Sequence, residues 1–116
     1  MKAARRGRVT PEMEQVLREE PVSRERLLAD LSAGRTVIPS NRLRRNLQAK
    51  GIGAGLRTKV NVNLGVSPDR GDREGEMQKA HLALRLGADA LMDLSVSSDS
   101  STLRRQLIQE IPLPLG

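Results

Sequence analysis

Apolar residues in the first third of the chain recur at helical spacing and predict two short helices. The first is expected to begin at Thr10, which can cap a helix, and Pro11, which suits the first turn, and to end before Pro21. The second is expected to begin at Ser23, with a leucine face and a glycine stop: Leu27, Leu28, Leu31 and Gly34. Residues 36–38 form a short run of β-prone side chains.

The second half of the chain alternates between strand and helix periodicity. Residues 58–64 and 88–94 predict strands, and residues 72–86 and 103–111 predict helices. The apolar positions of the first strand are Val60, Val62 and Leu64. The apolar side of the first helix is expected to hold Met77, Ala80, Ala83, Leu84 and Leu86, before a stop at Gly87. The second helix is expected to align Leu103, Leu107 and Ile111 in one row.

This order of elements predicts an α/β fold in which parallel strands are joined by helical crossovers. Two parallel strands do not complete a sheet, so the expected architecture is an N-terminal helical segment followed by the first units of an incomplete (β/α)8 barrel. The predicted division is a helical region over residues 1–40, a connector over 41–57 and the barrel units over 58–116. Within the connector we expect a basic helical turn at 42–50. A flexible glycine stretch at 51–55 lacks the dinucleotide-binding spacing and is a weak phosphate-loop signal.

The composition of these 116 residues excludes several kinds of functional site. The chain contains no Phe, Trp, Tyr or Cys and a single histidine, His81. Aromatic base-stacking platforms, disulfides, cysteine nucleophiles and a cluster held by its own thiolates are therefore excluded. A net charge of +6 permits nucleic acid or phosphate ligands, although most such charge belongs to solvated surface. The basic first residues precede no apolar run, so we expect no secretory signal, no membrane span and a cytoplasmic location.

Candidate binding residues lie where the two predicted strands end, because barrel ligands bind at the carboxyl ends of strands. Asn63 offers amide donors and an acceptor, Asp93 an acceptor, and a serine group at Ser95, Ser97 and Ser98 offers hydroxyl donors. Alternatives stay open. Asn61 and Asn63 are as readily turn caps, the serines more often mark helix entry, and Met92 within a strand is normally a core residue. His81 is expected on the surface, and no nucleophile–base pair or metal-ligand spacing is present.

Several motifs, taken in order, resemble the N-terminal part of the phosphomethylpyrimidine synthase (ThiC) family. The similarity extends over nearly the whole chain. Its motifs are ARRG at residues 4–7, TPEME at 10–14, AGRTVIPSN at 33–41, GIG at 51–53, KVNVNLG at 59–65, GADALMDLS at 87–95 and the run from Arg104 to Gly116. Each motif is modest alone, and the shared order makes the signal strong. Departures include Val96, Ser97 and Ser98, where the family commonly has Thr-Gly-Gly or Thr-Gly-Arg.

The resemblance implies a radical rearrangement of aminoimidazole ribotide to hydroxymethylpyrimidine phosphate in thiamine biosynthesis. It implies S-adenosylmethionine, a [4Fe–4S] cluster and zinc in the complete enzyme, a homodimer, and substrate contacts at Asn63 and Met92. It assigns no catalytic or metal-binding residue to these positions. The ligands for cluster and zinc are expected beyond Gly116, so the chain alone is expected to be inactive. Two alternatives are the paralogue that makes 5-hydroxybenzimidazole from the same ribotide, and a non-catalytic basic remnant. The expected partner is the small-molecule ribotide, and nucleic acid is not expected as a partner.

Overall fold

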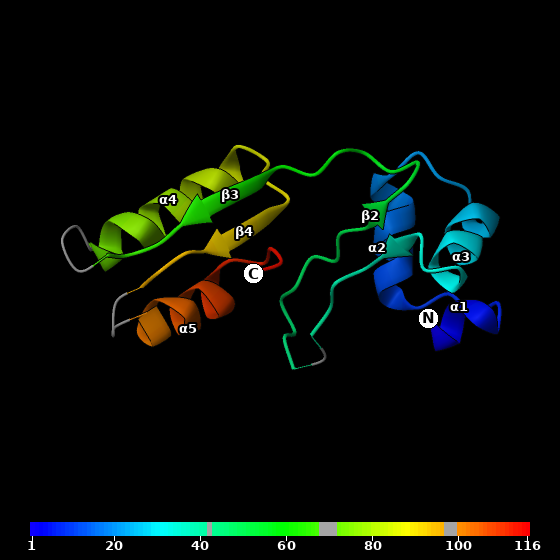
Figure 1. Ribbon diagram of the computed structural model, residues 1–116, viewed down its shortest axis with the longest axis horizontal. Helices are drawn as coiled ribbons and strands as arrows, with labels where there is room; N and C mark the ends of the chain where they lie inside the picture. Colours follow the sequence, from blue (N-terminus) through cyan, green and yellow to red (C-terminus); the bar gives the residue numbers. More distant parts are fainter. Residues whose placement is uncertain (42, 68–71, 97–99) are drawn as a thin grey trace. The chain divides into compact units, whose positions relative to one another are not determined.

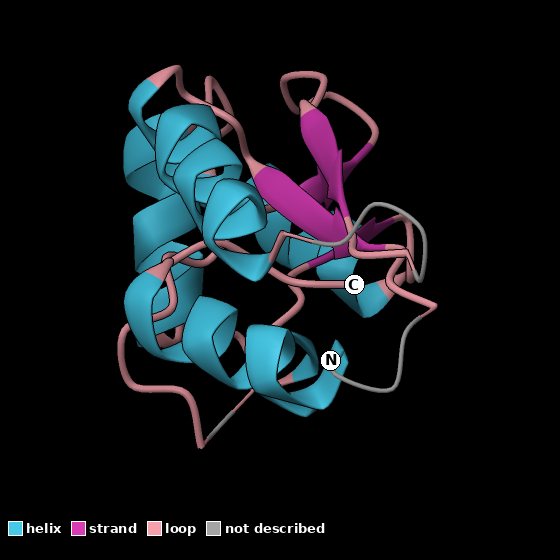
Figure 2. Cartoon of the chain, turned by 90° about the vertical axis from the view of Figure 1, so that its left-hand side faces the viewer, coloured by secondary structure: helices cyan, strands magenta, loops and turns pink. Residues whose placement is uncertain are grey.

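A computed structural model describes residues 1–41, 43–67, 72–96 and 100–116. Helices make up most of the regular structure, together with two small sheets (Figures 1 and 2). The chain forms two compact units. The first consists of Met1–Asn41 and Gln48–Thr58, and the second consists of Arg42–Leu47 and Lys59–Gly116. In the described part of the chain, no helix is long and apolar enough to cross a membrane.

The first unit is built on three helices, α1 (Lys2–Arg5), α2 (Pro11–Glu19) and α3 (Arg24–Ser32). The predicted starts of α2 and α3 are confirmed. The Thr10 side chain accepts a hydrogen bond from the Met13 amide, and Ser23 accepts one from the Arg26 amide. Both bonds satisfy amides that a helix start leaves unpaired. The buried core of this unit is Ala4, Met13, Val16, Leu27 and Leu31.

A two-stranded antiparallel sheet completes the first unit, with β1 (Thr36–Val37) pairing β2 (Ile52–Gly53). The strand at β1 was predicted, but β2 was not, and the expectation of a flexible glycine stretch is wrong at these two residues. Gly53 lies opposite Thr36, where a Cβ atom would stand 2.5 Å from both the Arg35 carbonyl oxygen and the Thr36 hydroxyl. Glycine is present here because the two backbones approach closely, and not to loosen the chain.

The second unit contains β3 (Asn61–Leu64), α4 (Arg73–Arg85), β4 (Ala90–Asp93) and α5 (Ser100–Glu110). β3 and β4 are parallel, which confirms the predicted alternation (Figure 1). Leu91 also forms an isolated parallel bridge with Leu115, so the exit from α5 returns to the open side of β4. The described residues form mixed helix and small sheets, an α/β composition without a closed barrel.

The core of the second unit lies between the strands and the two helices. Leu64 and Leu91 contribute from the strands, and Leu103, Leu107 and Ile111 form the predicted buried row along and after α5. Two core predictions are wrong. Leu86 is 78% exposed because it follows the last turn of α4, and Val60 is 55% exposed because it precedes the first residue of β3.

Residues 43–58 divide their contacts between the two units. In the second unit, Arg44 donates to the Ile111 and Leu113 carbonyls, and Asn46 donates to the Ile108 and Gln109 carbonyls. These oxygens belong to the C-terminal end of α5 and the residues after it, where carbonyls lack helical partners and a cation is favoured. Burial lowers the pKa of Arg44, although as an arginine it stays charged.

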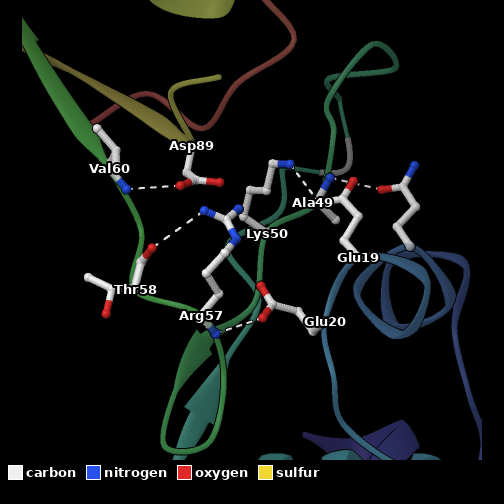
Figure 3. Close-up of polar contacts among 9 residues, drawn as sticks. Glu19, Glu20, Ala49, Lys50, Arg57, Thr58, Val60 and Asp89 are labelled. Atoms are coloured by element: carbon white, nitrogen blue, oxygen red, sulfur yellow. Dashed lines mark hydrogen bonds and ion pairs between the residues drawn. The ribbon is translucent and has the colours of Figure 1, made fainter. Parts of the chain in front are cut away.

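In the first unit, the connector contributes backbone groups, whereas in the second unit it contributes side chains. Side chains of α2 and its cap bind the backbone of the connector: Gln15 accepts from the Ala49 amide at 2.8 Å, and Glu20 from the Arg57 amide at 2.7 Å (Figure 3). Lys50 also pairs with Glu19 at 2.6 Å. The predicted helical turn is wrong for residues 43–50, which form turns and extended chain, because their polar groups bind α5 and α2. The predicted three-part domain division stays a prediction.

Candidate functional site

The two candidate substrate residues, Asn63 and Met92, are direct neighbours across the parallel pair β3–β4. The register aligns Asn61 with Ala90 and Asn63 with Met92. Strand side chains alternate between faces, and the neighbouring Leu64 and Leu91 are buried against the helices. Asn63 is therefore exposed, and Met92 is 39% exposed, on the opposite face. The expectation of Met92 as a core residue is wrong, because the helices cover the other side of its strand.

The amide of Asn63 is oriented by its neighbour on the same strand. Asn61 Nδ2 donates to Asn63 Oδ1 at 3.1 Å, and both side chains lie on the exposed face. The alternative in which these residues cap turns does not hold, because both belong to β3 itself. An oriented amide beside a thioether offers a polar and an apolar contact on one surface, which is a chemistry suited to a small heterocyclic ligand.

Asp93, the residue after Met92, is enclosed by hydrogen bonds. Its side chain is only 2% exposed. Oδ1 accepts from the Ser95 amide at 2.9 Å and from the Ser95 hydroxyl, and Oδ2 accepts from Arg104 Nε on α5. Burial opposes the charge, but the hydrogen bonds from Ser95 and Arg104 outweigh it and lower the pKa of Asp93 below its usual value. Asp93 is an ionised, fully engaged carboxylate.

The ends of β3 and β4 are bound to one another just beyond Asn63 and Met92. The Ser95 hydroxyl oxygen accepts from the Val66 amide at 3.0 Å, and the Leu94 amide donates to the Leu64 carbonyl at 2.8 Å. Gly65 lies between these contacts, where a Cβ atom would meet the Leu94 carbonyl carbon and the Ser95 amide at 2.8 Å. Only glycine allows the two strand ends to approach this closely.

Two further sequence predictions concern the serines and the histidine. The Ser95 hydroxyl binds Asp93 and the Val66 amide and so joins the strand ends, and its role as a phosphate donor stays a prediction. Ser97 and Ser98 lie outside the described residues. His81 pairs with Glu110 at 3.2 Å with its side chain 42% exposed, so its predicted surface position is confirmed.

Arg104 and Gly116 were not singled out as site residues. Arg104 lies in the helix predicted over residues 103–111, and nothing in its spacing indicates that it binds Asp93. Gly116 ends the motif run that begins at Arg104. A Cβ atom there would stand 3.5 Å from Met92 Cε, an ordinary contact distance, so Gly116 lies beside the methionine side chain. Gly116 comes to lie beside Met92 because the chain after α5 pairs with β4 in the folded protein.

The residues that the structure describes do not fit an iron–sulfur cluster or a zinc site. Cysteine is absent, and His81 is the single histidine. Within residues 1–41, 43–67, 72–96 and 100–116, no three metal-ligating side chains come together. An iron–sulfur cluster needs cysteine thiolates and a zinc site needs several nitrogen, sulfur or oxygen ligands, so these positions supply neither.

Comparison with known proteins agrees with the motifs. The profile described as "Radical SAM ThiC family" matches residues 1–116. Phosphomethylpyrimidine synthases from Moorella thermoacetica and Desulforudis audaxviator are 50% and 49% identical over 116 residues, and the enzyme from Thermus thermophilus is 44% identical over 117. Each comparison covers 100% of this chain but only 27% of the relative, so the chain spans about a quarter of their length. The chain belongs to the Radical SAM ThiC family.

Proposed function

We propose that the protein containing this chain is a phosphomethylpyrimidine synthase, which converts aminoimidazole ribotide to hydroxymethylpyrimidine phosphate in thiamine biosynthesis. The observation that supports it most is the match over the whole chain to a family of synthases, with curated relatives near 50% identity. The synthase name belongs to those relatives, and its transfer to this protein is the proposal.

Within this proposal, Asn63 and Met92 contact the ribotide. Their support is geometric: they are register partners, both are exposed, and they lie on the face of β3–β4 that α4 and α5 leave uncovered. The Asn63 amide, oriented by Asn61, would hydrogen-bond a ring or ribose polar atom. The Met92 thioether would pack on the ring.

We also propose that the second unit is the start of a larger (β/α)8 barrel. The parallel pair β3–β4, the helices on one of its faces and the return of Leu115 beside Leu91 are what a growing parallel sheet requires. In the complete barrel, the Asn63–Met92 face would line the interior. S-adenosylmethionine, a [4Fe–4S] cluster and zinc would be held by other parts of the protein, and the complete enzyme would be a homodimer.

The test is anaerobic turnover by the protein in its full natural length. Purified enzyme is given the ribotide, S-adenosylmethionine and a reductant, and the product is identified by mass spectrometry. A phosphorylated hydroxymethylpyrimidine is the expected product. A benzimidazole would reassign the protein to the paralogous reaction, and an unchanged ribotide under conditions in which a relative turns over would refute the proposal.

The matched test of the site uses Asn63→Ala and Met92→Ala. The control is Val96→Ala, which changes an exposed apolar residue just after β4. Loss of a hydrogen bond or of a packed thioether typically costs about 1 kcal/mol or more, so ribotide affinity should fall about fivefold to tenfold in both variants. Unchanged affinity in both would refute the assignment of these residues.

A further inference from the structure

We propose that Asp93, bound to Arg104 and Ser95, is a positioning residue that sets the placement of Met92 and Asn63 at the end of the β3–β4 pair. This inference rests on the proposed function and deepens it. An aspartate next to a candidate ligand contact is ordinarily the first choice for a proton-transferring group or a ligand. The contacts around Asp93 argue for a different role.

The first argument is access. The Asp93 side chain is 2% exposed, whereas its chain neighbour Met92 is 39% exposed. Three donors fill its two oxygens: the Ser95 amide, the Ser95 hydroxyl and Arg104 Nε. A group that transfers protons to a ligand must come within hydrogen-bonding distance of it. A carboxylate that is buried and occupied in this way can act only through the groups that it holds.

The second argument is connectivity. Asp93 holds Ser95, Ser95 holds the Val66 amide, and Val66 lies three residues beyond Asn63. On the other side of β4, the Asp93 amide donates at 2.9 Å to the Gly116 carbonyl, and Gly116 lies against Met92. One residue thereby ties together α5, the exits of both strands and the chain segment beside Met92. A shift at Asp93 would move both candidate ligand contacts.

The third argument is the alignment of the strands. Asp93 is the register partner of Leu64, just as Met92 is the partner of Asn63. The two named strands end at this pair, and the ends of strands open more readily than their centres. Arg104 enters from α5 and secures the end by a charge-assisted hydrogen bond, which is stronger than a neutral one.

The experiment compares Asp93→Asn, Arg104→Met and the double variant in the protein of full natural length. Glu110→Gln is the control, because Glu110 is also a charged residue of α5 but pairs with His81. Ribotide affinity is measured by calorimetry without turnover. The environment of Met92 is followed by the NMR signal of its 13C-labelled methyl group, assigned by Met92→Leu. Thermal unfolding is recorded in parallel.

The expected result is a weakening of ribotide binding of about tenfold in each single variant, with a shifted Met92 methyl signal and little further loss in the double variant. Arg104→Lys should restore part of the affinity, and Glu110→Gln should change neither readout. The pH dependence of kcat should keep its shape in Asp93→Asn.

Three outcomes would overturn the proposal. Lower unfolding temperature with unchanged affinity and Met92 signal would make Asp93 merely structural. Loss of one ionisation from the kcat profile in Asp93→Asn, without a matching effect of Arg104→Met, would make it a catalytic residue. An unmoved Met92 signal contradicts the inference even if wild-type protein binds no ribotide, and that lack of binding would instead count against the proposed function.

Discussion

Asp30 in the first unit and Asp93 in the second are both aspartates with side chains only 2% exposed, and both are bound by arginine. Asp30 accepts from Arg26 Nε at 2.6 Å and from Arg35 Nε at 2.8 Å, while its carbonyl accepts from the Arg35 amide at 2.9 Å. These contacts span four or five residues and close the end of α3 onto β1. Those of Asp93 also reach across to α5.

The difference lies in the surroundings of the two carboxylates. We call the set of hydrogen bonds around each aspartate its clamp. Asp30 precedes Leu31, a core residue, so the Asp30 clamp stabilises the packing of one helix. Asp93 follows Met92 on a strand whose other face is covered, so its clamp fixes exposed side chains in place. Two aspartates whose side chains are equally exposed thus differ in what they hold, and only the neighbouring side chains show which one serves a site.

The largest loss of stability is expected from a substitution that forces apart the backbones just after β3 and β4 and leaves the Asp93 side chain unchanged. Gly65→Ala places a Cβ atom 2.8 Å from the backbone of Leu94 and Ser95, and we expect it to cost about 3 kcal/mol in unfolding free energy. Its counterpart near Asp30 is Gly34→Ala, where φ is +74° but nothing lies within 4 Å of the added atom. That variant should cost about 1 kcal/mol.

Denaturant unfolding measures both values, and amide exchange assigns each loss to one unit. Equal losses for the two glycines would mean that backbone conformation alone governs both positions. It would also remove the close approach at Gly65 as an explanation for the arrangement of the site.

The connector offers the second way to sharpen the comparison. Arg44→Met leaves the Ile111 and Leu113 carbonyls without their charged donor and should cost about 2 kcal/mol. Lys50→Met removes one ion pair whose partner Glu19 is 41% exposed, and should cost less than about 1 kcal/mol. Exchange protection at the end of α5 should fall in the first variant alone. Similar losses of stability in both variants would contradict the conclusion that Arg44 stabilises the C-terminal end of α5.

Acid should weaken both aspartate clamps. Hydrogen bonds from Arg26 and Arg35 lower the pKa of Asp30, and those from Ser95 and Arg104 lower the pKa of Asp93 despite its burial. A carboxylate with a lowered folded pKa contributes stability that is present above its unfolded pKa of about 3.9 and is lost as pH falls through the folded value. Carboxyl-carbon NMR should show both groups titrating below that value. A midpoint above it for either residue would contradict its clamp.

The smallest effect is expected at the surface between α4 and α5. His81 and Glu110 pair at 3.2 Å with both side chains more than 40% exposed, so Glu110→Gln should change stability by less than about 0.5 kcal/mol. Thermal unfolding at low and high salt checks this value. A loss of more than 1 kcal/mol would mean that this pair, and not the apolar row on α5, joins the two helices.

Local signals in the sequence predicted much of the fold. Thr10, Pro11 and Ser23 indicate helix starts because their side chains satisfy or dispense with orphan amides, and the structure confirms them. Alternation and spacing predicted the parallel strands and the row that ends at Ile111. β2 was missed because its two residues pair with a strand distant in sequence, and glycine carries no strand propensity.

The candidate site was predictable in part. The strand-end rule indicated Asn63, the family resemblance added Met92, and the register makes the two residues partners. The sequence did not indicate that Met92 is exposed, because that depends on which face of the sheet the helices cover. It also did not indicate Arg104 as the partner of Asp93, because an ion pair between two elements has no sequence spacing of its own.

The division of the connector's contacts has a consequence for recombination among relatives. Up to Leu47 its side chains bind the end of α5, and from Gln48 onward its backbone is held by α2 and its cap. A chimera that exchanged the whole connector would have to match two independent sets of partners. A crossover placed between Leu47 and Gln48 would keep Arg44 and Asn46 with their own α5, and keep Ala49 and Arg57 with their own α2. Family chimeras should therefore tolerate a junction there better than one at either border of the connector.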